Sequence, residues 1–158
     1  MTGATALRAG RFRKIRWRAM SDPGIGERRD EIGRGSDQVR MFVSDTLIRV
    51  GHDATVRELA RRMAGEGVGA LVVTEGDQVH GIVSERDVVA AVAAGKDLDA
   101  TTAADIDSRR LVTCTPDTSL QEAAVLMMEH YVRHLLVNDH TGPVGVVSAR
   151  DLLGAYAI

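Results

Sequence analysis

An internal duplication limits the folds that this sequence can adopt. The heptapeptide GIVSERD at 81–87 returns as GVVSARD at 145–151, 64 positions later. Aligning residues 50–94 with residues 114–158 at this offset needs no gap and gives 14 identities in 45 positions. Chance does not produce such a match, so this part of the chain contains two copies of one structural unit.

Each copy carries the pattern strand, helix, strand, strand, helix. In the first copy a short apolar strand at 47–50 precedes TVRE at 55–58, which fits a helix start with a capping box. Two strands at 70–73 and 80–84 follow, and a helix at 85–95 closes the copy. In the second copy the same elements are expected at 111–114, from 119 onward, at 134–137, at 144–148 and at 149–157.

A unit of about 50 residues buries too small a share of its surface to be stable alone. Two copies packed through their sheets can share one core. A duplication without gaps also predicts a pseudo-twofold axis, which brings equivalent motifs close to one another. The predicted fold class is therefore α+β, with two β-α-β-β-α repeats packed with pseudo-twofold symmetry.

Charge separates the repeats from the head of the chain. Residues 1–40 carry ten basic and five acidic side chains, whereas residues 41–158 carry ten basic and seventeen acidic ones. The head lacks apolar periodicity, which indicates a disordered basic tail; alternatively, Met20 or Met41 is the true start. The expected organisation is a tail at 1–40, a first repeat at 41–94, a linker at 95–110 and a second repeat at 111–158.

The composition argues against several classes of protein. The single Cys114 allows no internal disulfide and is expected to pack as a small apolar residue in a reducing interior. No apolar run is long enough to span a membrane, and the N-terminus lacks a signal peptide, so a cytoplasmic location is expected. The sequence contains no nucleophile–base pair, phosphate-binding Gly–Lys loop or paired catalytic carboxylates, which indicates a protein that is not an enzyme.

Two β-α-β-β-α copies, each ending in Gly-apolar-x-Ser-x-x-Asp, resemble a tandem pair of CBS domains, the module named after cystathionine β-synthase. The resemblance covers roughly residues 41–158. It implies a stand-alone regulatory protein that binds AMP, ADP, ATP or S-adenosylmethionine in clefts between the repeats and signals occupancy to a partner protein. It also implies a homodimer, whose surface the apolar final helices can supply, and no required cofactor.

The resemblance further implies ten ligand-binding residues. The motif aspartates would accept hydrogen bonds from ribose hydroxyls, since an ionised carboxylate can take both protons of a vicinal diol. The motif serines would bind ribose or phosphate at a helix N-terminus, and the glycines would let the strand approach the ligand. The arginines and the start of the second strand would face phosphates. These residues are Gly81, Ser84, Arg86, Asp87, Arg133, His134, Gly145, Ser148, Arg150 and Asp151.

A structural alternative exists for the motif itself. The sequences SERD and SARD also fit a helix cap, in which serine and aspartate satisfy free N–H groups and contribute about 1 kcal/mol each. The two copies differ nearby, because Gly69 and Ala70 stand where the second copy has Arg133 and His134. We therefore expect the cleft of Asp151 to take a phosphorylated ligand. The other cleft is expected to be empty or to take an uncharged nucleoside.

Two other functions are compatible with the sequence. One is a ligand-free scaffold or stress-associated homodimer that kept the fold and lost the binding. The other is nucleic-acid binding through the cationic segment at 8–18. His130 and His134 have the spacing of two metal ligands on a helix, but His134 falls in a predicted strand and no third ligand stands nearby, so no metal site is expected.

Overall fold

The computed structural model describes residues 37–43 and 47–156, apart from the side chain of Tyr156. The disordered tail predicted for 1–40 lies outside these residues except for its last four positions. The elements in chain order are a 3₁₀ helix η3 (Val39–Met41), β1 (Arg49–Gly51), α1 (Val56–Glu66), β2 (Ala70–Glu75), β3 (Gln78–Ser84), α2 (Glu85–Ala93), α3 (Ala103–Ile106), β4 (Thr113–Cys114), α4 (Leu120–Glu129), β5 (His134–Asp139), β6 (Gly142–Ser148) and α5 (Ala149–Tyr156).

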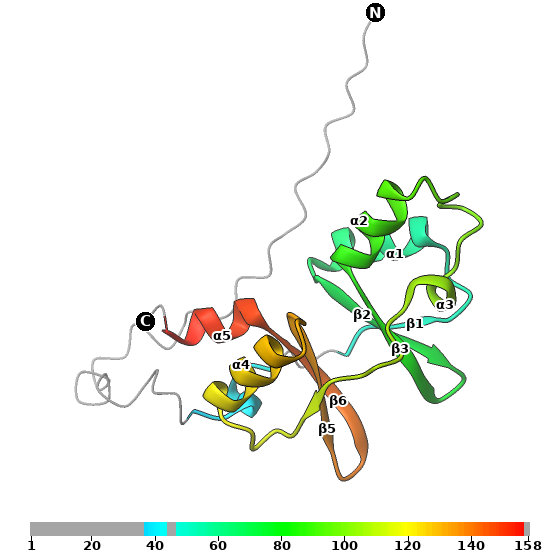
Figure 1. Ribbon diagram of the computed structural model, residues 1–158. Coiled ribbons are helices and arrows are strands. Elements are labelled where there is room, and N and C mark those ends of the chain that lie inside the picture. Colours follow the sequence, from blue (N-terminus) through cyan, green and yellow to red (C-terminus); the bar gives the residue numbers. More distant parts are fainter. Residues whose placement is uncertain (1–36, 44–46, 157–158) are drawn as a thin grey trace, which may run out of the picture.

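Two three-stranded sheets form the framework, one in each repeat (Figure 1). In each sheet the first strand pairs in parallel with the second, and the second pairs antiparallel with the third. The register shifts at equivalent places, between Val73 and Thr74 and between Val137 and Asn138. The predicted α+β fold with two β-α-β-β-α repeats is confirmed.

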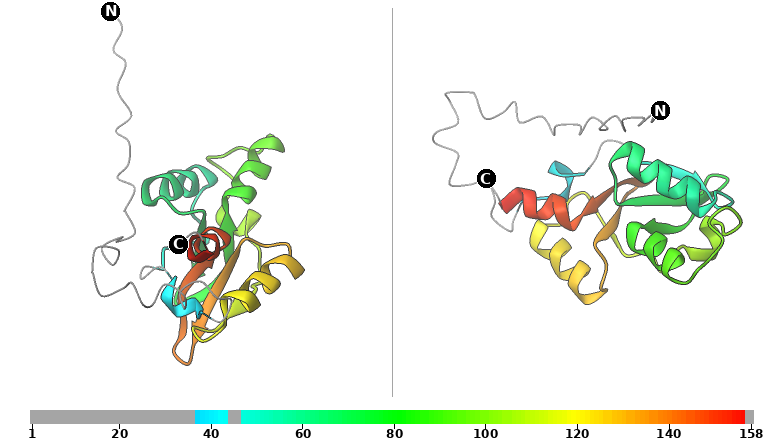
Figure 2. Two further views of the ribbon diagram at one scale, coloured as in Figure 1. Left: turned by 90° about the vertical axis from the view of Figure 1, so that its left-hand side faces the viewer. Right: turned by 90° about the horizontal axis from the view of Figure 1, so that it is seen from above.

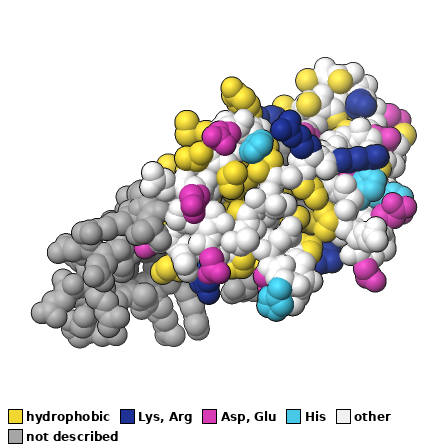
Figure 3. All heavy atoms as spheres, turned by 60° about the horizontal axis from the view of Figure 1, so that its bottom comes forward, with side chains coloured by type: hydrophobic (Ala, Val, Ile, Leu, Met, Phe, Trp, Pro, Cys, Tyr) yellow, Lys and Arg dark blue, Asp and Glu magenta, His cyan; other side chains and the backbone are white. Residues whose placement is uncertain are grey.

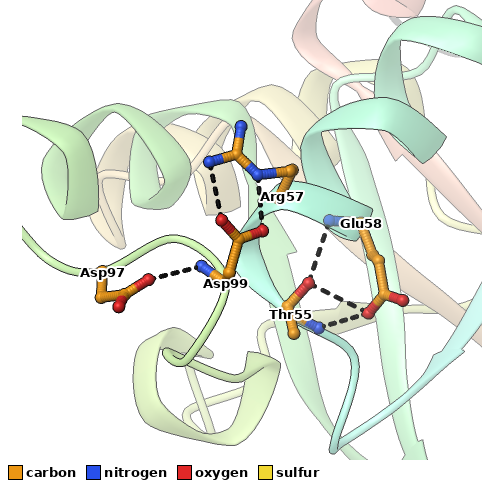
Figure 4. Close-up of polar contacts among 5 residues, drawn as sticks. All are labelled: Thr55, Arg57, Glu58, Asp97 and Asp99. Atoms are coloured by element: carbon orange, nitrogen blue, oxygen red, sulfur yellow. Dashed lines mark hydrogen bonds and ion pairs between the residues drawn. The ribbon is translucent and has the colours of Figure 1, made fainter.

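The helices begin where the sequence places their caps. Thr55 donates from its backbone N–H to Glu58 Oε2 at 2.8 Å, and its Oγ1 accepts from the Glu58 N–H at 3.3 Å, which closes the capping box of α1 (Figure 4). Ser119 and Glu122 repeat this arrangement at α4, with distances of 2.9 and 3.2 Å. Both predicted capping boxes are therefore present. Such a cap stabilises a helix by about 1 kcal/mol.

Each repeat has its own hydrophobic core, because its helices pack on its own sheet (Figures 1 and 2). The expectation of one shared core is wrong in this respect. Side chains alternate along a strand, so Val72 and Leu136 point away from these cores, and both are nevertheless buried. The buried residues of the first core are Leu59, Met63, Leu71, Val73, Val83 and Ala103; those of the second are Val39, Cys114, Leu120, Ala123, Met127, Leu135, Val137, Val147, Leu152 and Ala155.

The two repeats exchange short segments. Val39, at the head of the first repeat, is fully buried in the second core, and its N–H donates to the Thr118 carbonyl at 2.8 Å. Ala103, 64 positions later, is fully buried in the first core, and its N–H donates to the Ala54 carbonyl at 2.7 Å. Each core is thus completed by the segment that precedes the other repeat, so the two repeats depend on each other for stability.

The linker is also tied to the first repeat. The Arg57 guanidinium binds the Asp99 carboxylate through two hydrogen bonds of 2.5 and 2.9 Å (Figure 4). The hydrogen bond to Asp99 raises the pKa of Arg57, and the same contact lowers the pKa of Asp99. Both side chains are exposed, so this pair guides the path of the linker more than it stabilises the fold.

A search of the described residues found no helix with the length and apolar character needed to cross a membrane.

Candidate functional site

The duplicated motif lies at the junction of a strand and a helix in both repeats. Ser84 ends β3, and its N–H and Oγ both donate to Asp87 Oδ2 at 2.7 Å. Ser148 ends β6, and its N–H and Oγ donate to Asp151 Oδ2 at 2.8 and 2.6 Å. The helix cap of the structural alternative is therefore present in both copies.

The cap leaves part of each carboxylate available. Within residues 37–43 and 47–156, hydrogen bonds are made only to Oδ2 of Asp87 and Asp151, and none is made to Oδ1. Both aspartates are half-buried rather than fully exposed. A carboxylate oxygen has two acceptor sites, so capping is compatible with an additional bond to a hydroxyl group.

The carboxylates of both motif copies influence the pKa of one imidazole, that of His134 at the start of β5. Burial lowers the pKa of His134, and the neighbouring Arg133 lowers it further. Three carboxylates oppose this decrease by their charge, those of Glu85, Asp151 and Asp87. His134 therefore lies near both motif aspartates, and the pseudo-twofold arrangement brings them to one junction between the repeats.

His134 reaches across to the first repeat at Gly69. A Cβ atom at Gly69 would lie 3.1 Å from His134 Nε2 and 3.3 Å from Glu85 Oε2. The Glu85 N–H donates to the Gly69 carbonyl at 3.0 Å, which holds the start of α2 against this glycine. Sequence reasoning did not select Glu85; its alignment with Ala149 of the second repeat was the signal that could have found it.

The predicted arginines lie around this junction rather than inside it. Arg86, Arg133 and Arg150 are all exposed. The Arg133 carbonyl accepts from the Ala149 N–H at 2.9 Å, which places Arg133 at the N-terminus of α5. Arg133 is thus a cation at the start of α5, within the second copy of the motif's strand-to-helix junction.

The glycine of the first motif has a close neighbour from the linker. A Cβ atom at Gly81 would collide with the carboxylate of Asp107, whose side chain is 1% exposed. The Asp107 carboxylate binds His80 Nδ1 at 2.6 Å and lies 3.8 Å from Arg109 Nε. The close approach that Gly81 permits in this structure is therefore that of the linker, while the role of Gly145 toward a ligand stays a prediction.

Two open hollows lie on the surface. One, of about 300 Å³, is lined by Asp87, residues of α2, Lys96 and Ile106. The other, of about 480 Å³, lies along α4 between Thr118 and Leu126 and includes no predicted site residue. Ligand pockets start at about 300 Å³, so the hollow beside Asp87 reaches the lower limit for a small molecule.

The described residues test the expectations about a metal site and about nucleic-acid binding only in part. In the part of the chain that it describes, no three His, Cys, Asp or Glu side chains are grouped as a metal site would require. The cationic segment at 8–18 lies outside the described residues. Figure 3 shows one face of the molecule, on which basic, acidic, histidine and apolar side chains are interspersed, without the extended basic area typical of nucleic-acid binding.

Comparisons with known proteins agree with this architecture. The chain is 34% identical over 115 residues to the CBS domain-containing protein YhcV of Bacillus subtilis, an alignment that covers 72% of this chain and 81% of YhcV. Among solved structures, the CBS-domain containing protein ATU1752 of Agrobacterium tumefaciens superposes with a TM-score of 0.71 at 26% identity, covering 76% of this chain and 93% of that one.

A second similar structure is the CBS domain pair of protein MJ0100, solved in complex with 5′-methylthioadenosine and S-adenosyl-L-methionine. Its TM-score is 0.68 at 22% identity, with 77% of this chain and 96% of that one covered. Other curated relatives are longer: the chain aligns with 52% of one from Methanopyrus kandleri and 53% of one from Arabidopsis thaliana, about half of each.

The CBS domain family matches the chain twice, over residues 39–94 and 103–158. These two ranges contain the exchanged segments around Val39 and Ala103 as well as the two sheets. The match covers most of the chain and coincides with the duplication. The chain therefore belongs to the CBS domain family and carries two CBS domains.

Proposed function

We propose that this protein is a cytoplasmic, non-catalytic regulator that binds an adenosyl ligand (AMP, ADP, ATP or S-adenosylmethionine) in clefts between its two CBS domains. The observation that carries this proposal is the position of the duplicated motif. Asp87 and Asp151 follow equivalent strand ends, where Ser84 pairs with Ala70 and Ser148 pairs with His134, and the carboxylates of both oppose the lowering of the pKa of His134. In each, Oδ1 remains available for a ribose hydroxyl.

Two further facts support this assignment. A protein of the same fold holds 5′-methylthioadenosine and S-adenosylmethionine in its CBS pair. The motif serines also end a strand immediately before a helix, where backbone N–H groups and the helix dipole favour an anion. Ribose and phosphate recognition can therefore be supplied by residues only a few positions apart.

Signalling would follow from a change in the population of conformations. A ligand that contacts both repeats stabilises the arrangement to which it binds more tightly. Because the repeats exchange segments, a shift of one repeat relative to the other is transmitted to both cores. A partner protein that recognises one arrangement can then read the occupancy of the clefts.

The helices offer a surface for the homodimer that we include in this proposal. Helices α1, α2, α4 and α5 are seen together from above in the right-hand view of Figure 2. Large apolar side chains on three of these helices are exposed, and burying them against a second copy is favourable. They are Val89 and Val92 on α2, Val125 and Met128 on α4, and Leu153 on α5.

A thermal-shift panel of adenosyl compounds tests the proposal. A ligand at about one hundred times its Kd should stabilise the protein by about 2.7 kcal/mol. Asp151→Ala and Asp87→Ala should each remove binding at their own cleft and cost only about 1 kcal/mol of stability through the lost cap. Asp53→Ala, which removes another aspartate present in both repeats, serves as the control and should bind as the native protein does.

The ligand-free scaffold is the second candidate, and the caps favour it. Because Asp87 and Asp151 already stabilise helix starts, their presence in both repeats does not require a ligand. No stabilisation by any adenosyl compound at millimolar concentration would leave this candidate standing and refute the sensor.

A further inference from the structure

We propose that the two clefts select adenosyl ligands by charge and that Glu85 is the deciding residue. The cleft of Asp151, beside Arg133, takes a phosphorylated adenosyl compound. The cleft of Asp87, beside Glu85, rejects phosphate and takes an adenosyl sulfonium such as S-adenosylmethionine. This inference rests on the proposed function and specifies the ligand class of each cleft.

The charged residues at the junction are not related by the pseudo-twofold symmetry. Position 85 is glutamate, and its equivalent in the second repeat is Ala149. Position 133 is arginine, and its equivalent in the first repeat is Gly69. The first repeat therefore has an additional negative charge within its motif, and the second repeat has an additional positive charge just before its second strand. Arg86 and Arg150 occupy equivalent positions and do not contribute to this difference.

Packing disfavours a side chain at Gly69, the position equivalent to Arg133. A Cβ atom there would lie 3.1 Å from His134 Nε2 and 3.3 Å from Glu85 Oε2. Both distances are tighter than ordinary Cβ contacts, so the ends of these two side chains would have to shift by a few tenths of an ångström. The first repeat thus has the carboxylate of Glu85, and no cation, beside this position.

The surrounding charges act in the same direction. Of the groups that act electrostatically on His134, one is a cation, Arg133, and three are carboxylates. The lowered pKa of His134 keeps its imidazole neutral near pH 7, so it does not compensate Glu85. The hollow beside Asp87 is lined by the cation Lys96 and not by Glu85, so the cleft that we assign to Asp87 is the one at the junction with Gly69 and His134 and not this hollow.

Ligand charge then decides between the clefts. Phosphate oxygens placed beside the exposed Glu85 and the half-buried Asp87 would face two like charges, which is unfavourable. A sulfonium carries a positive charge without hydrogen-bond donors, so it gains from nearby carboxylates and needs no specific acceptor geometry. Beside Arg133 the same reasoning favours phosphate.

Isothermal titration calorimetry with AMP and S-adenosylmethionine tests this inference on the full chain. The native protein should bind one AMP and one S-adenosylmethionine per chain at separate sites. Glu85→Gln, which removes the charge at constant size, should admit AMP to the second site and weaken S-adenosylmethionine by about tenfold or more. Ala149→Glu should weaken AMP by about tenfold or more, whereas Ala149→Gln, of similar size, should not.

Glu129→Ala, an exposed glutamate at the end of α4, is the control for charge effects at a distance. Equal binding of AMP at both sites of the native protein, unchanged by Glu85→Gln, would overturn charge selection and leave the adenosyl sensor standing. Equal loss of AMP in Ala149→Glu and Ala149→Gln would attribute the effect to size and also overturn it. Absence of binding by AMP, ADP, ATP and S-adenosylmethionine alike would instead refute the proposed function.

Discussion

The first and second CBS domains share a backbone but differ in the side chains that meet at their junctions. Strand pairing, the position of the bulge and the capped helix starts coincide at an offset of 64 residues. The contacts of the linker and of the junction at Gly69 and His134 do not. The identical residues thus maintain the fold twice, while the residues that differ give each half its own chemistry.

A buried hydrogen bond illustrates this difference. At the bulge the first repeat has His80, bonded to the buried Asp107, with the ring of His52 stacked 5.9 Å away. At an offset of 64 residues, Val144 of the second repeat corresponds to His80, and Val43, in the segment before the first repeat, corresponds to Asp107. One edge is therefore held by a buried hydrogen bond, and the other carries only apolar side chains at these positions.

Breaking the exchanged segments should have the largest effect. Val39→Asp places a charge in the second core and should cost at least about 3 kcal/mol, because the carboxylate has no buried partner. Hydrogen exchange should accelerate first in β5 and β6, although Val39 precedes the first repeat. Ala103→Asp should instead accelerate exchange in β2 and β3.

Gln38→Asp, at the exposed neighbouring position, should change stability by less than about 0.5 kcal/mol. Faster exchange in β2 and β3 for Val39→Asp would contradict the exchange of segments.

Removing the buried contact between His80 and Asp107 should rank second. His80→Ala leaves the Asp107 carboxylate buried beside only Arg109 and should cost about 3 kcal/mol in chemical denaturation. Val144→Ala, at the same bulge in the second repeat, is partly exposed and should cost less than about 1 kcal/mol.

The double variant His80→Val with Asp107→Val gives the first repeat the valines of the second. It should recover most of the loss, since apolar replacements of buried ion pairs are often neutral. A double variant less stable than His80→Ala would contradict this prediction. It would show that the contact between His80 and Asp107 stabilises the first repeat and cannot be replaced by apolar packing.

The residues that follow α1 and α4, the first helices of the two repeats, should differ by a smaller free energy. Tyr131 has a φ of 55° and is 86% exposed. Its equivalent Gly67 has a φ of 68°, and glycine adopts this left-handed backbone region without strain. Tyr131→Gly should stabilise the protein by about 1 kcal/mol, because a left-handed backbone is unfavourable for tyrosine. Gly67→Ala should destabilise it by about as much. Thermal unfolding measures both, and a destabilised Tyr131→Gly would mean that the ring makes a stabilising contact.

The smallest expected difference between the repeats is the effect of His134, which has Ala70 as its equivalent, on the pH dependence of the free energy of unfolding. Because the pKa of His134 is lowered in the folded state, the unfolded chain binds the proton first as pH falls. The contribution of His134 is therefore present above its ordinary pKa of 6.5 and is lost as pH falls from there toward the folded-state value. His134→Ala, which matches Ala70 of the first repeat, should flatten this part of the curve between about pH 8 and about pH 5.

His130→Ala, at an exposed position, should leave the curve unchanged. A steeper loss of stability at low pH in His134→Ala than in the native protein would contradict a lowered pKa of His134 in the folded state.

The sequence predicted the repeated elements well because they depend on local signals. Apolar alternation marks β2 and β5, and Thr55 and Ser119 mark helix starts that the structure contains. The exchange of segments was not predictable in this way, since Val39 and Ala103 lie in short stretches without periodicity. Their burial depends on the other repeat, which is a tertiary effect.

The site was predictable only in part. The strand-to-helix position of Ser84 and Asp87 followed from the motif, but the approach of Glu85 and His134 to Gly69 depends on the packing of one repeat against the other. The same is true of Asp107, whose burial against Gly81 depends on the path of the linker. Alignment of the two copies shows where they differ, and only the structure shows which of the differing residues meet.

The central claim is that the motif aspartates hold the ribose of an adenosyl ligand. A crystal structure of the protein with AMP and S-adenosylmethionine tests it most directly. The account predicts ribose hydroxyls at about 2.6–3.0 Å from Oδ1 of Asp151 for AMP, with the phosphate beside Arg133, and from Oδ1 of Asp87 for S-adenosylmethionine. Adenosyl groups bound away from both aspartates, for example in the hollow along α4, would contradict it.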